Sequence, residues 1–230
     1  MVKRTAKVVS HDETRIVLTG VLVSCVGSTL KMVATDSYRL AVSETELDSP
    51  CPEEFEAVIA GSFLQDIASL PQSEDPITIA LNDNQIVVTY RDTTFINRRI
   101  EGTFPNYKQL IAEGYSTRAT LSTHALTDAV RRVSLLSNKV SPVQVRVDAE
   151  SGVVTLLTNS QDIGNAQENL ICEVDGESVD IAFNFTFMLD GLNSIDTDAV
   201  HLDLFGPMKP GILRAAEGEN FLYLIMPVRV

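Results

Sequence analysis

Five functional side chains follow one another at residues 35–39, Thr-Asp-Ser-Tyr-Arg, between two apolar flanks. Asp36 beside Ser37, with a histidine such as His11 elsewhere, provides the residue types of a nucleophilic triad. Their spacing gives no indication that the three side chains meet, so a hydrolase has little support. Two interpretations of residues 32–42 stay open at this point: a polar turn between two strands, and a surface that holds a ligand.

Other catalytic and metal-binding patterns are missing from the sequence. It contains no G-x-S-x-G, H-E-x-x-H, P-loop or G-x-G-x-x-G motif. Glu53 and Glu54 lie in a proline-rich segment typical of a solvated loop, and His11, His124 and His201 are scattered. The cysteines do not have the spacing of metal ligands. We therefore expect no catalytic residues, no metal, no cofactor and no enzymatic activity.

Composition and charge describe the class of protein. With 230 residues and 44% hydrophobic residues, the chain can form one large domain or two ordinary ones. No apolar stretch approaches the ~18 residues of a membrane span, and the basic N-terminus lacks the apolar core of a secretory signal. Three cysteines favour reduced, mostly buried thiols, so we expect a cytoplasmic protein. A net charge of −13 argues against general coating of nucleic acid but permits a local basic surface.

The elements that must position these residues belong to an internal sequence repeat. Residues 20–37 resemble 142–160, and residues 62–70 resemble 186–194, both at an offset of about 123 residues. Each copy reads as a helix, a hairpin with a glycine in its turn, further strands and a second short helix. We read two copies of one α+β domain, joined near 108–117.

The expected domains are 1–115 and 116–230, each with antiparallel sheets on one side and two helices on the other. The first helix of each copy is expected at about 2–10 and about 123–137, with Ser122 or Thr123 as the N-cap of the latter.

Cations lie on the first helix of each copy. They are Lys3, Arg4, Lys7, Arg131 and Arg132, with Lys139 just beyond. Helical spacing places them away from the apolar stripes, as phosphate-binding groups would be. From charge alone, an ordinary solvated helix face is favoured. Asp66 and Asp190, the only charges on the second helices, weaken the case for a nucleic-acid surface further.

Six segments together resemble one family, the bacterial sliding clamp (β subunit of DNA polymerase III). They are "VLTGVLV…VATDSYRLAV" (17–42), "FPNY" (104–107), "LLSN" (135–138), "FNFTFMLDGL" (183–192), "KPGILR" (209–214) and "FLYLIMPVRV" (221–230). The resemblance covers nearly the whole chain, but only the second and third of the family's three domains. By this comparison, residues 1–115 are the middle clamp domain without its first strand, and 116–230 are the C-terminal clamp domain.

The resemblance implies a processivity factor that works by topology. In the family, two chains form a homodimeric ring with helices lining a channel for double-stranded DNA, which is bound without sequence specificity. The implied partners are this DNA, the DNA polymerase III α subunit, the clamp loader and other proteins with clamp-binding motifs, and no membrane. Without a first domain, we expect this chain not to encircle DNA. A truncated regulatory paralogue that binds replication proteins is the alternative.

The resemblance also reverses the interpretation of the cations. Lys3, Arg4, Lys7, Arg131 and Arg132 become the expected DNA-facing residues. Sparse cations suit a channel that holds DNA without reading it, since phosphate contacts position without specifying. One departure counts against strong DNA contact: "IAGSF" at 59–63 replaces basic residues that are frequent at this helix start in the family.

Family members also bind linear peptide motifs, often of the type Gln-Leu-x-Leu-Phe, in a hydrophobic pocket between the second and third domains. The residues that the resemblance assigns to this pocket are Leu18, Thr35, Ser37, Tyr38, Arg39, Leu40, Pro105, Leu110 and Met226 for one subsite, Val140, Asn184, Phe187, Met208 and Pro210 for the adjoining groove, and Pro227, Val228 and Arg229 for its C-terminal wall. Leu18, Leu40 and Phe187 are equally compatible with plain core positions. Gln109, Ser37 and Tyr38 replace a frequent basic residue, glycine and histidine, which can alter the preferred peptide.

The internal repeat distinguishes residues of the segment 32–42 that form the turn from those that are candidates for ligand binding. Thr-Asp-Ser has the counterpart Thr-Asn-Ser at 158–160, so Asp36 is expected to shape the turn through backbone contacts. Tyr-Arg-Leu at 38–40 has no such counterpart, because the second copy reads Gln-Asp-Ile at 161–163. We therefore predict that residues 38–40 contact the bound peptide, and that Arg39 is exposed in the peptide-binding groove.

Overall fold

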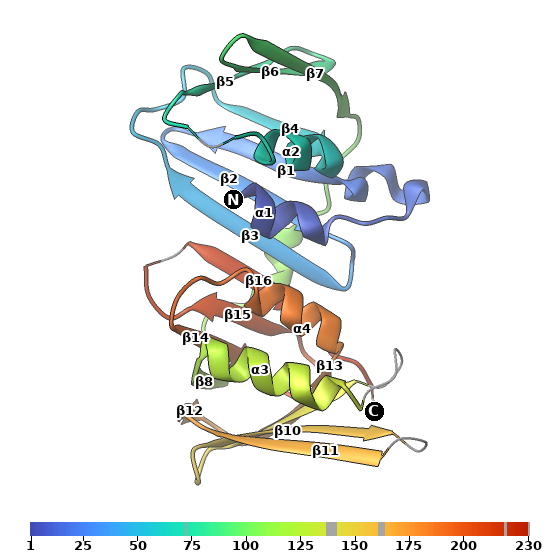
Figure 1. Cartoon of the computed structure of the whole chain (residues 1–230), viewed down its shortest axis with the longest axis vertical. Coiled ribbons are helices and arrows are strands. Elements are labelled where there is room, and N and C mark those ends of the chain that lie inside the picture. The colour runs from blue at the N-terminus through green and yellow to red at the C-terminus, as the bar shows by residue number, and fades with distance from the viewer. Residues whose placement is uncertain (72, 137–141, 161–163, 219, 230) are drawn as a thin grey trace. The chain divides into compact units, whose positions relative to one another are not determined.

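The computed structural model describes all residues except 72, 137–141, 161–163, 219 and 230 (Figure 1). The chain divides into two compact units, Met1–Asn106 and Tyr107–Val230. Residues 107–115 are grouped here with the second unit, whereas the sequence suggested a boundary after 115. The Ser116 amide donates to Leu204 O at 3.0 Å and the Tyr115 hydroxyl donates to Asp175 at 2.7 Å, which ties the end of this segment to the second unit.

The first unit begins with helical turns and continues with strands. Its elements are α1 (Val2–Thr5), η1 (Ala6–Val8), η2 (Glu13–Thr19), β1 (Gly20–Val26), β2 (Thr29–Thr35), β3 (Arg39–Glu46), β4 (Phe55–Ala60), α2 (Gly61–Ala68), β5 (Ile77–Leu81), β6 (Gln85–Tyr90) and β7 (Thr93–Ile100). The strands are antiparallel and follow the order β3-β2-β1-β4-β7-β6-β5. The helix expected at about 2–10 is present as α1 and the 3₁₀ turn η1.

The elements of the second unit repeat this pattern, with a longer first helix. They are η3 (Tyr107–Leu110), β8 (Thr117–Ser122), α3 (Thr123–Ser134), β9 (Val143–Asp148), β10 (Val153–Ser160), β11 (Gly164–Ile171), β12 (Glu173–Gly176), β13 (Val179–Phe183), α4 (Phe185–Leu192), β14 (Ala199–Leu204), β15 (Gly211–Ala215) and β16 (Phe221–Ile225). Two antiparallel sheets result, β11-β10-β9-β13 and β12-β8-β14-β15-β16.

Each unit places its two helices side by side against its strands (Figure 1). In the second unit α3 packs on β9, β10 and β11, while α4 packs on β16. The side chains between these layers are fully buried, among them Leu126, Val130, Leu156, Met188 and Tyr223. The α+β class and the tandem repeat of helices on one face of antiparallel sheets are therefore confirmed.

Side chains at the helix starts explain why the second unit's helices are well defined. Ser122, rather than Thr123, caps α3 by accepting from the Ala125 amide at 3.3 Å. Asn184 caps α4 by accepting from the amides of Thr186 at 2.8 Å and Phe187 at 3.4 Å. These caps satisfy amides that have no partner within the helix. Asn184 therefore has a structural task whether or not it touches a ligand.

The repeat also reveals one difference between the units. β14 pairs with β8 on one side and β15 on the other, and its inward residue Leu202 is 1% exposed. In the order of elements β5 occupies the same place, but among the described residues it pairs with β6 alone. Its residues Ile77 and Ile79 are 48% and 43% exposed, although they lie opposite the buried Tyr90 and Val88. This edge of the first unit is therefore open and apolar.

A buried carboxylate holds three strands of the second unit together. Asp203 on β14 is 0% exposed. It accepts from Arg118 of β8 through Nε at 2.6 Å and Nη2 at 2.8 Å, and Arg214 Nε of β15 lies 3.4 Å away. Arg118 also lies over the Tyr115 ring, 4.1 Å from its centroid. Two arginines thus compensate one charge that is removed from water.

His201, next to this group, is expected to make the stability of the second unit depend on pH. Burial, and then the Arg118 charge, lower the pKa of His201 from its ordinary 6.5. Between the two pKa values the unfolded chain binds the proton and the folded chain does not, so we expect the free energy of unfolding to fall as pH decreases below 6.5. Urea unfolding at several pH values checks this, and His201→Gln should flatten the curve. His124→Gln is the control, because that side chain is 88% exposed; an equal flattening there would contradict the assignment.

Candidate peptide-binding and DNA-facing surfaces

The turn between β2 and β3 is built by Asp36. Its Oδ1 accepts from the amides of Tyr38 at 2.9 Å and Arg39 at 3.0 Å. Thr35 Oγ1 accepts from the Ser37 amide at 3.1 Å and donates to Arg39 O at 2.7 Å. The expectation that Asp36 shapes the turn through backbone contacts is confirmed. This geometry leaves Tyr38 at the tip of the turn, 62% exposed.

Arg39 is not the exposed residue that the sequence suggested, and that prediction was wrong. Its side chain is only 10% exposed. Its Nε donates to Asp36 Oδ2 at 3.0 Å and its Nη2 donates to the Lys7 carbonyl at 3.3 Å. Since a guanidinium leaves water readily only when it is paired, the adjacent carboxylate explains the inward position. Arg39 positions the turn, while Tyr38 provides its accessible surface.

The hydrolase interpretation gains no support from this geometry. The Asp36 carboxylate is engaged by two amides and the Arg39 guanidinium. Ser37 Oγ accepts a hydrogen bond from Arg15 Nη1 at 2.8 Å, a contact that does not activate a nucleophile. Arg15 also approaches Asp36 O at 3.4 Å and Asp12 Oδ2 at 3.3 Å. Sequence reasoning missed Arg15, because its partners are brought near by the path of η2.

Ser37 has a backbone conformation that suits glycine, with φ of 79°. A side chain in this region costs about 1 kcal/mol relative to glycine. We therefore expect Ser37→Gly to raise the free energy of unfolding by about 0.5–1 kcal/mol, after the loss of the exposed Arg15 contact. Chemical denaturation measures the change. Ser24→Gly, within β1, should instead destabilise the chain; two changes of the same sign would contradict the strain at Ser37.

The remaining predicted residues of the first unit separate by burial. Leu18, Thr35 and Leu40 are 7%, 5% and 1% exposed, so they belong to the core of the unit. Pro105 is exposed. The buried residues can support a binding surface from below, but the direct contacts must come from side chains such as Tyr38.

A hollow in the second unit brings together two of the predicted groove residues, which precede β15 and follow β16. Met208, after β14, and Val228, after β16, line a cavity of about 250 Å³. The Val228 amide donates to Ala182 O at 2.8 Å, which holds the C-terminal segment along β13. Met208 and Val228 are 54% and 37% exposed. The cavity lining that the sequence did not suggest is Gln144, Val145, Arg146, Leu157, Asp180, Ile181, Ala182 and Pro207.

This cavity has an apolar floor and a charged rim. Leu157 and Ile181 come from β10 and β13, while Arg146 Nε donates to Asp180 Oδ1 at 3.0 Å. Adaptable Met208 beside aliphatic side chains suits the apolar side chains of a peptide. The only available sequence signal for Gln144 and Arg146 was the alternation of β9, which directs every second residue away from the core.

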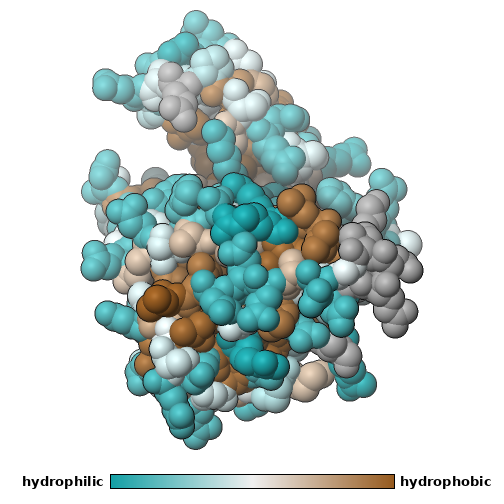
Figure 2. Space-filling view, turned by 60° about the horizontal axis from the view of Figure 1, so that its bottom comes forward, coloured by the Kyte–Doolittle hydropathy of each residue, from teal (hydrophilic) through white to brown (hydrophobic). Residues whose placement is uncertain are grey.

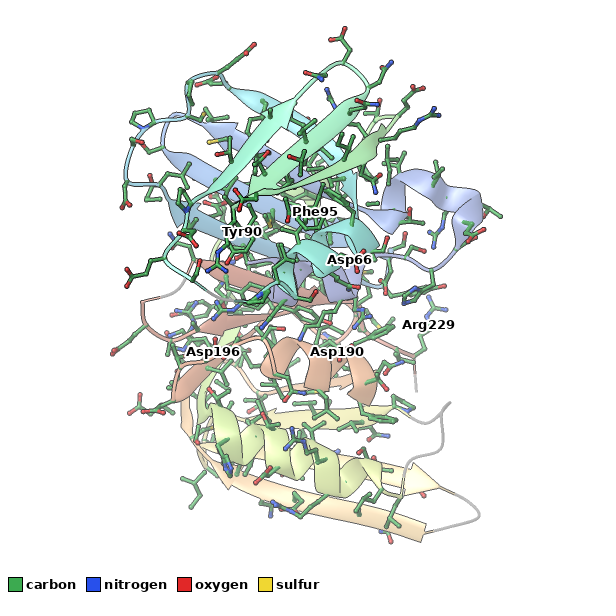
Figure 3. All side chains as sticks on the ribbon, turned by 45° about the horizontal axis from the view of Figure 1, so that its top comes forward. Asp66, Tyr90, Phe95, Asp190, Asp196 and Arg229 are labelled. Atoms are coloured by element: carbon green, nitrogen blue, oxygen red, sulfur yellow. The ribbon has the colours of Figure 1, made fainter. Side chains whose placement is uncertain are left out.

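The structure does not place the other predicted groove residues in this cavity. Phe187 is half-buried on α4 and Pro210 is half-buried before β15. Leu110 is 48% and Met226 37% exposed, Pro227 is half-buried, and Arg229, labelled in Figure 3, is exposed near the C-terminus. Val140, Lys139 and residues 161–163 lie outside the described residues.

The two arginines of α3 form hydrogen bonds and ion pairs with side chains of the second unit. Arg132 donates to Glu168 of β11 through Nε at 2.7 Å and Nη2 at 3.1 Å, which lowers the pKa of that carboxyl. Arg131 donates to Asn193 Oδ1 at 3.1 Å and approaches Asp128 at 3.4 Å. Both pairs are exposed and therefore exchangeable for phosphate at small cost. In the first unit Lys3 is exposed, while Arg4 and Lys7 are half-buried.

Acidic groups accompany these cations. Figure 3 labels Asp66 on α2 and Asp190 on α4, the second helices of the two units. A hollow of about 480 Å³ beside Arg131 is lined by Asp128, Asp196 and Asp198. Such a surface attracts phosphate weakly, since affinity comes from an excess of Lys and Arg. The face shown in Figure 2 carries hydrophobic areas that hydrophilic side chains separate from one another.

Comparisons with solved structures define the class of this fold. The sliding clamp of Bacillus subtilis matches with a TM-score of 0.95 and 28% identity, over 100% of this chain and 61% of that chain. The β chain of DNA polymerase III from Streptococcus pneumoniae matches with a TM-score of 0.94 and 29% identity, over 100% and 62%. The fold is therefore that of sliding clamps, in two tandem copies.

Family models identify the family itself. The central domain of the DNA polymerase III β subunit matches residues 1–106, and the C-terminal domain matches residues 108–229. The chain belongs to the DNA polymerase III β subunit family. The beta sliding clamps of a Synechocystis species and of Staphylococcus aureus are 33% and 32% identical to it. The match covers 96% and 100% of this chain but only 60% and 61% of those proteins.

One further structural observation concerns membranes. Within the described part of the chain, every helix is too short or too polar to span a bilayer.

Proposed function

We propose that this chain is the part of a bacterial sliding clamp that recruits partner proteins, and that it acts by binding rather than by catalysis. Its partners are short linear peptides of the Gln-Leu-x-Leu-Phe type carried by the replicative polymerase, the clamp loader and other replication or repair proteins. The observation that carries the proposal is the cavity of about 250 Å³ that Met208 and Val228 line. Family membership over both matched domains supports it.

The chemistry of the exposed residues fits such a ligand. Met208 and Val228 offer apolar surface to Leu and Phe side chains, and Tyr38 offers an aromatic ring with a polar tip. The Arg146–Asp180 pair at the cavity rim provides polar groups that can orient a peptide backbone. Other predicted residues that are exposed or half-buried stay part of the proposed surface: Pro105, Leu110, Asn184, Phe187, Pro210, Met226, Pro227 and Arg229.

Fluorescence anisotropy with a labelled Gln-Leu-x-Leu-Phe peptide tests the proposal. We expect saturable binding, and Met208→Glu or Met226→Glu should weaken it at least about tenfold, because a carboxylate is costly to bury against apolar side chains. Val26→Glu is the matched control, since Val26 is 58% exposed on β1, outside the proposed surface. No binding at hundreds of micromolar, or an equal loss in the control, would overturn the proposal.

We further propose that a complete ring containing these two domains encloses double-stranded DNA as a homodimer. Lys3, Arg4, Lys7, Arg131 and Arg132 are then the DNA-facing cations. The exposed pairs of Arg131 and Arg132 support weak, exchangeable phosphate contacts. A cytoplasmic location follows from this role in replication.

The alternative is a regulatory paralogue that binds replication proteins without encircling DNA. Retention on circular plasmid DNA separates the two functions. A clamp that encircles DNA stays on the closed plasmid through gel filtration and is released when the plasmid is linearised. Peptide binding without such retention would favour the paralogue.

A further inference from the structure

Two of the free cysteines meet in the first unit, although 25 residues separate them in the sequence. Cys25 is the second-last residue of β1, opposite Leu30 of β2 and Phe55 of β4, and is 1% exposed. Cys51 is half-buried in the loop that connects β3 and β4. One thiol is therefore enclosed by strands, while the other is accessible from the loop.

Hydrogen bonds hold the two cysteines around one carbonyl group. The Cys51 amide donates to Gly27 O at 2.9 Å, and Cys25 Sγ approaches the same oxygen at 3.9 Å. After burial, Cys51 is the neighbour with the largest effect in raising the pKa of the Cys25 thiol. The two residues are therefore neighbours in the folded chain.

The loop is fastened on both sides of Cys51. Before it, the Leu47 amide donates to Ser28 O at 2.8 Å. After it, Glu54 Oε1 accepts from the Gly27 amide at 3.3 Å. Both contacts join the loop to the turn of the β1–β2 hairpin, so the proximity of the thiols is fixed by several independent bonds.

We propose that Cys25 and Cys51 are a redox modification site, which forms an intramolecular disulfide when the chain meets a low-molecular-weight disulfide and reopens with a thiol reductant. This site is independent of the proposed peptide-binding function. The disulfide would join β1 covalently to the β3–β4 loop, and no residue of the second unit takes part.

Accessibility sets the order of the two exchange steps. Burial, with the neighbouring Cys51, raises the pKa of the Cys25 thiol to about 11, so Cys25 is a poor first nucleophile. Cys51 attacks one sulfur of oxidised glutathione, which forms a mixed disulfide and releases one glutathione thiolate. Cys25 then attacks the Cys51 sulfur and releases the second glutathione. The two protein thiol protons end on the two glutathiones, so two thiols and one small disulfide give one protein disulfide and two small thiols.

Mass spectrometry after incubation with oxidised glutathione tests the site. We expect the intact chain to lose the mass of two hydrogen atoms, and a tryptic digest to contain peptide 16–31 linked to peptide 40–91. Reduction with dithiothreitol should separate them. The thermal midpoint should rise by about 5–10 °C on oxidation, as expected for closing a loop of this length.

Single substitutions distinguish this disulfide from other products. Cys51→Ser, in a surface loop, should abolish the linked peptide, while Cys172→Ser in the second unit should leave it unchanged. Cys25→Ser should leave only the mixed disulfide on Cys51. A product in which Cys51 stays glutathionylated in the unaltered chain, or in which the link involves Cys172 or a second chain, would overturn the proposal.

Discussion

Arg118→Met is expected to destabilise the second unit by about 3 kcal/mol or more. The reason is the position of Asp203, whose side chain is 1% exposed between β8 and β15. Arg118 provides two of the short contacts to this carboxylate, at 2.6 and 2.8 Å, and Arg214 would remain at 3.4 Å. A buried charge that loses its main partner keeps its desolvation penalty without compensation. Urea or thermal unfolding measures the change.

Arg146→Met is the matched control, because it removes the same side chain from an aspartate in the same unit. The Arg146–Asp180 pair is 57% and 65% exposed, so its loss should change the free energy of unfolding by less than about 1 kcal/mol. Restoring an uncharged core with Asp203→Leu in the Arg118→Met background should recover much of the stability. Equal effects of the two arginine substitutions would contradict the assigned role of burial.

The local pattern of apolar residues, glycines and capping residues in the sequence was sufficient to predict the secondary structure and the repeat. The β-branched runs around Gly27 and Gly152 are separated by glycine turns, and both became hairpins of adjacent strands. The helix starting after Ser122 carries its apolar residues at helical spacing, and Ser122 caps it. These features depend on neighbours within a few residues, so one sequence is enough to read them.

The site was predicted less well because its side chains are placed by distant partners. Arg39 carried the right chemistry, but Asp36 and the carbonyl of Lys7, which lies 32 residues away, turn it inward. Arg132 carried the right charge, but Glu168 on β11 engages it. A residue's type is visible in the sequence, whereas its partner depends on how strands and helices pack.

The same reason explains the missed cavity and the cysteine pair. Arg146 and Asp180 line one cavity because β9 and β13 are adjacent, which no spacing in the chain reveals. Cys25 and Cys51 meet because the β3–β4 loop returns to the β1–β2 turn. The count of three cysteines suggested reduced, mostly buried thiols, yet only Cys25 is buried, while Cys51 and Cys172 are half-buried.

Gly176→Ala is expected to destabilise the second unit by more than about 3 kcal/mol, through strain and a steric clash together. Gly176 ends β12 with φ of 110°, a conformation that side chains rarely adopt. A Cβ at this position would lie 2.0 Å from the carbonyl oxygen of Ser116. That oxygen belongs to the backbone just before β8, the strand whose Arg118 compensates Asp203, so relief of the clash requires β8 or β12 to move.

Gly206→Ala separates the two causes, since Gly206 has φ of 132° but no atom within 4 Å of the added Cβ. Backbone strain alone should cost about 1–2 kcal/mol there. Chemical denaturation of both variants gives the difference, which we assign to the contact with Ser116 O. If the two alanine variants lost equal stability, the close approach of β12 and β8 would contribute nothing. A larger loss in Gly176→Ala shows that the close packing of β12 on β8 contributes to the stability of the second unit.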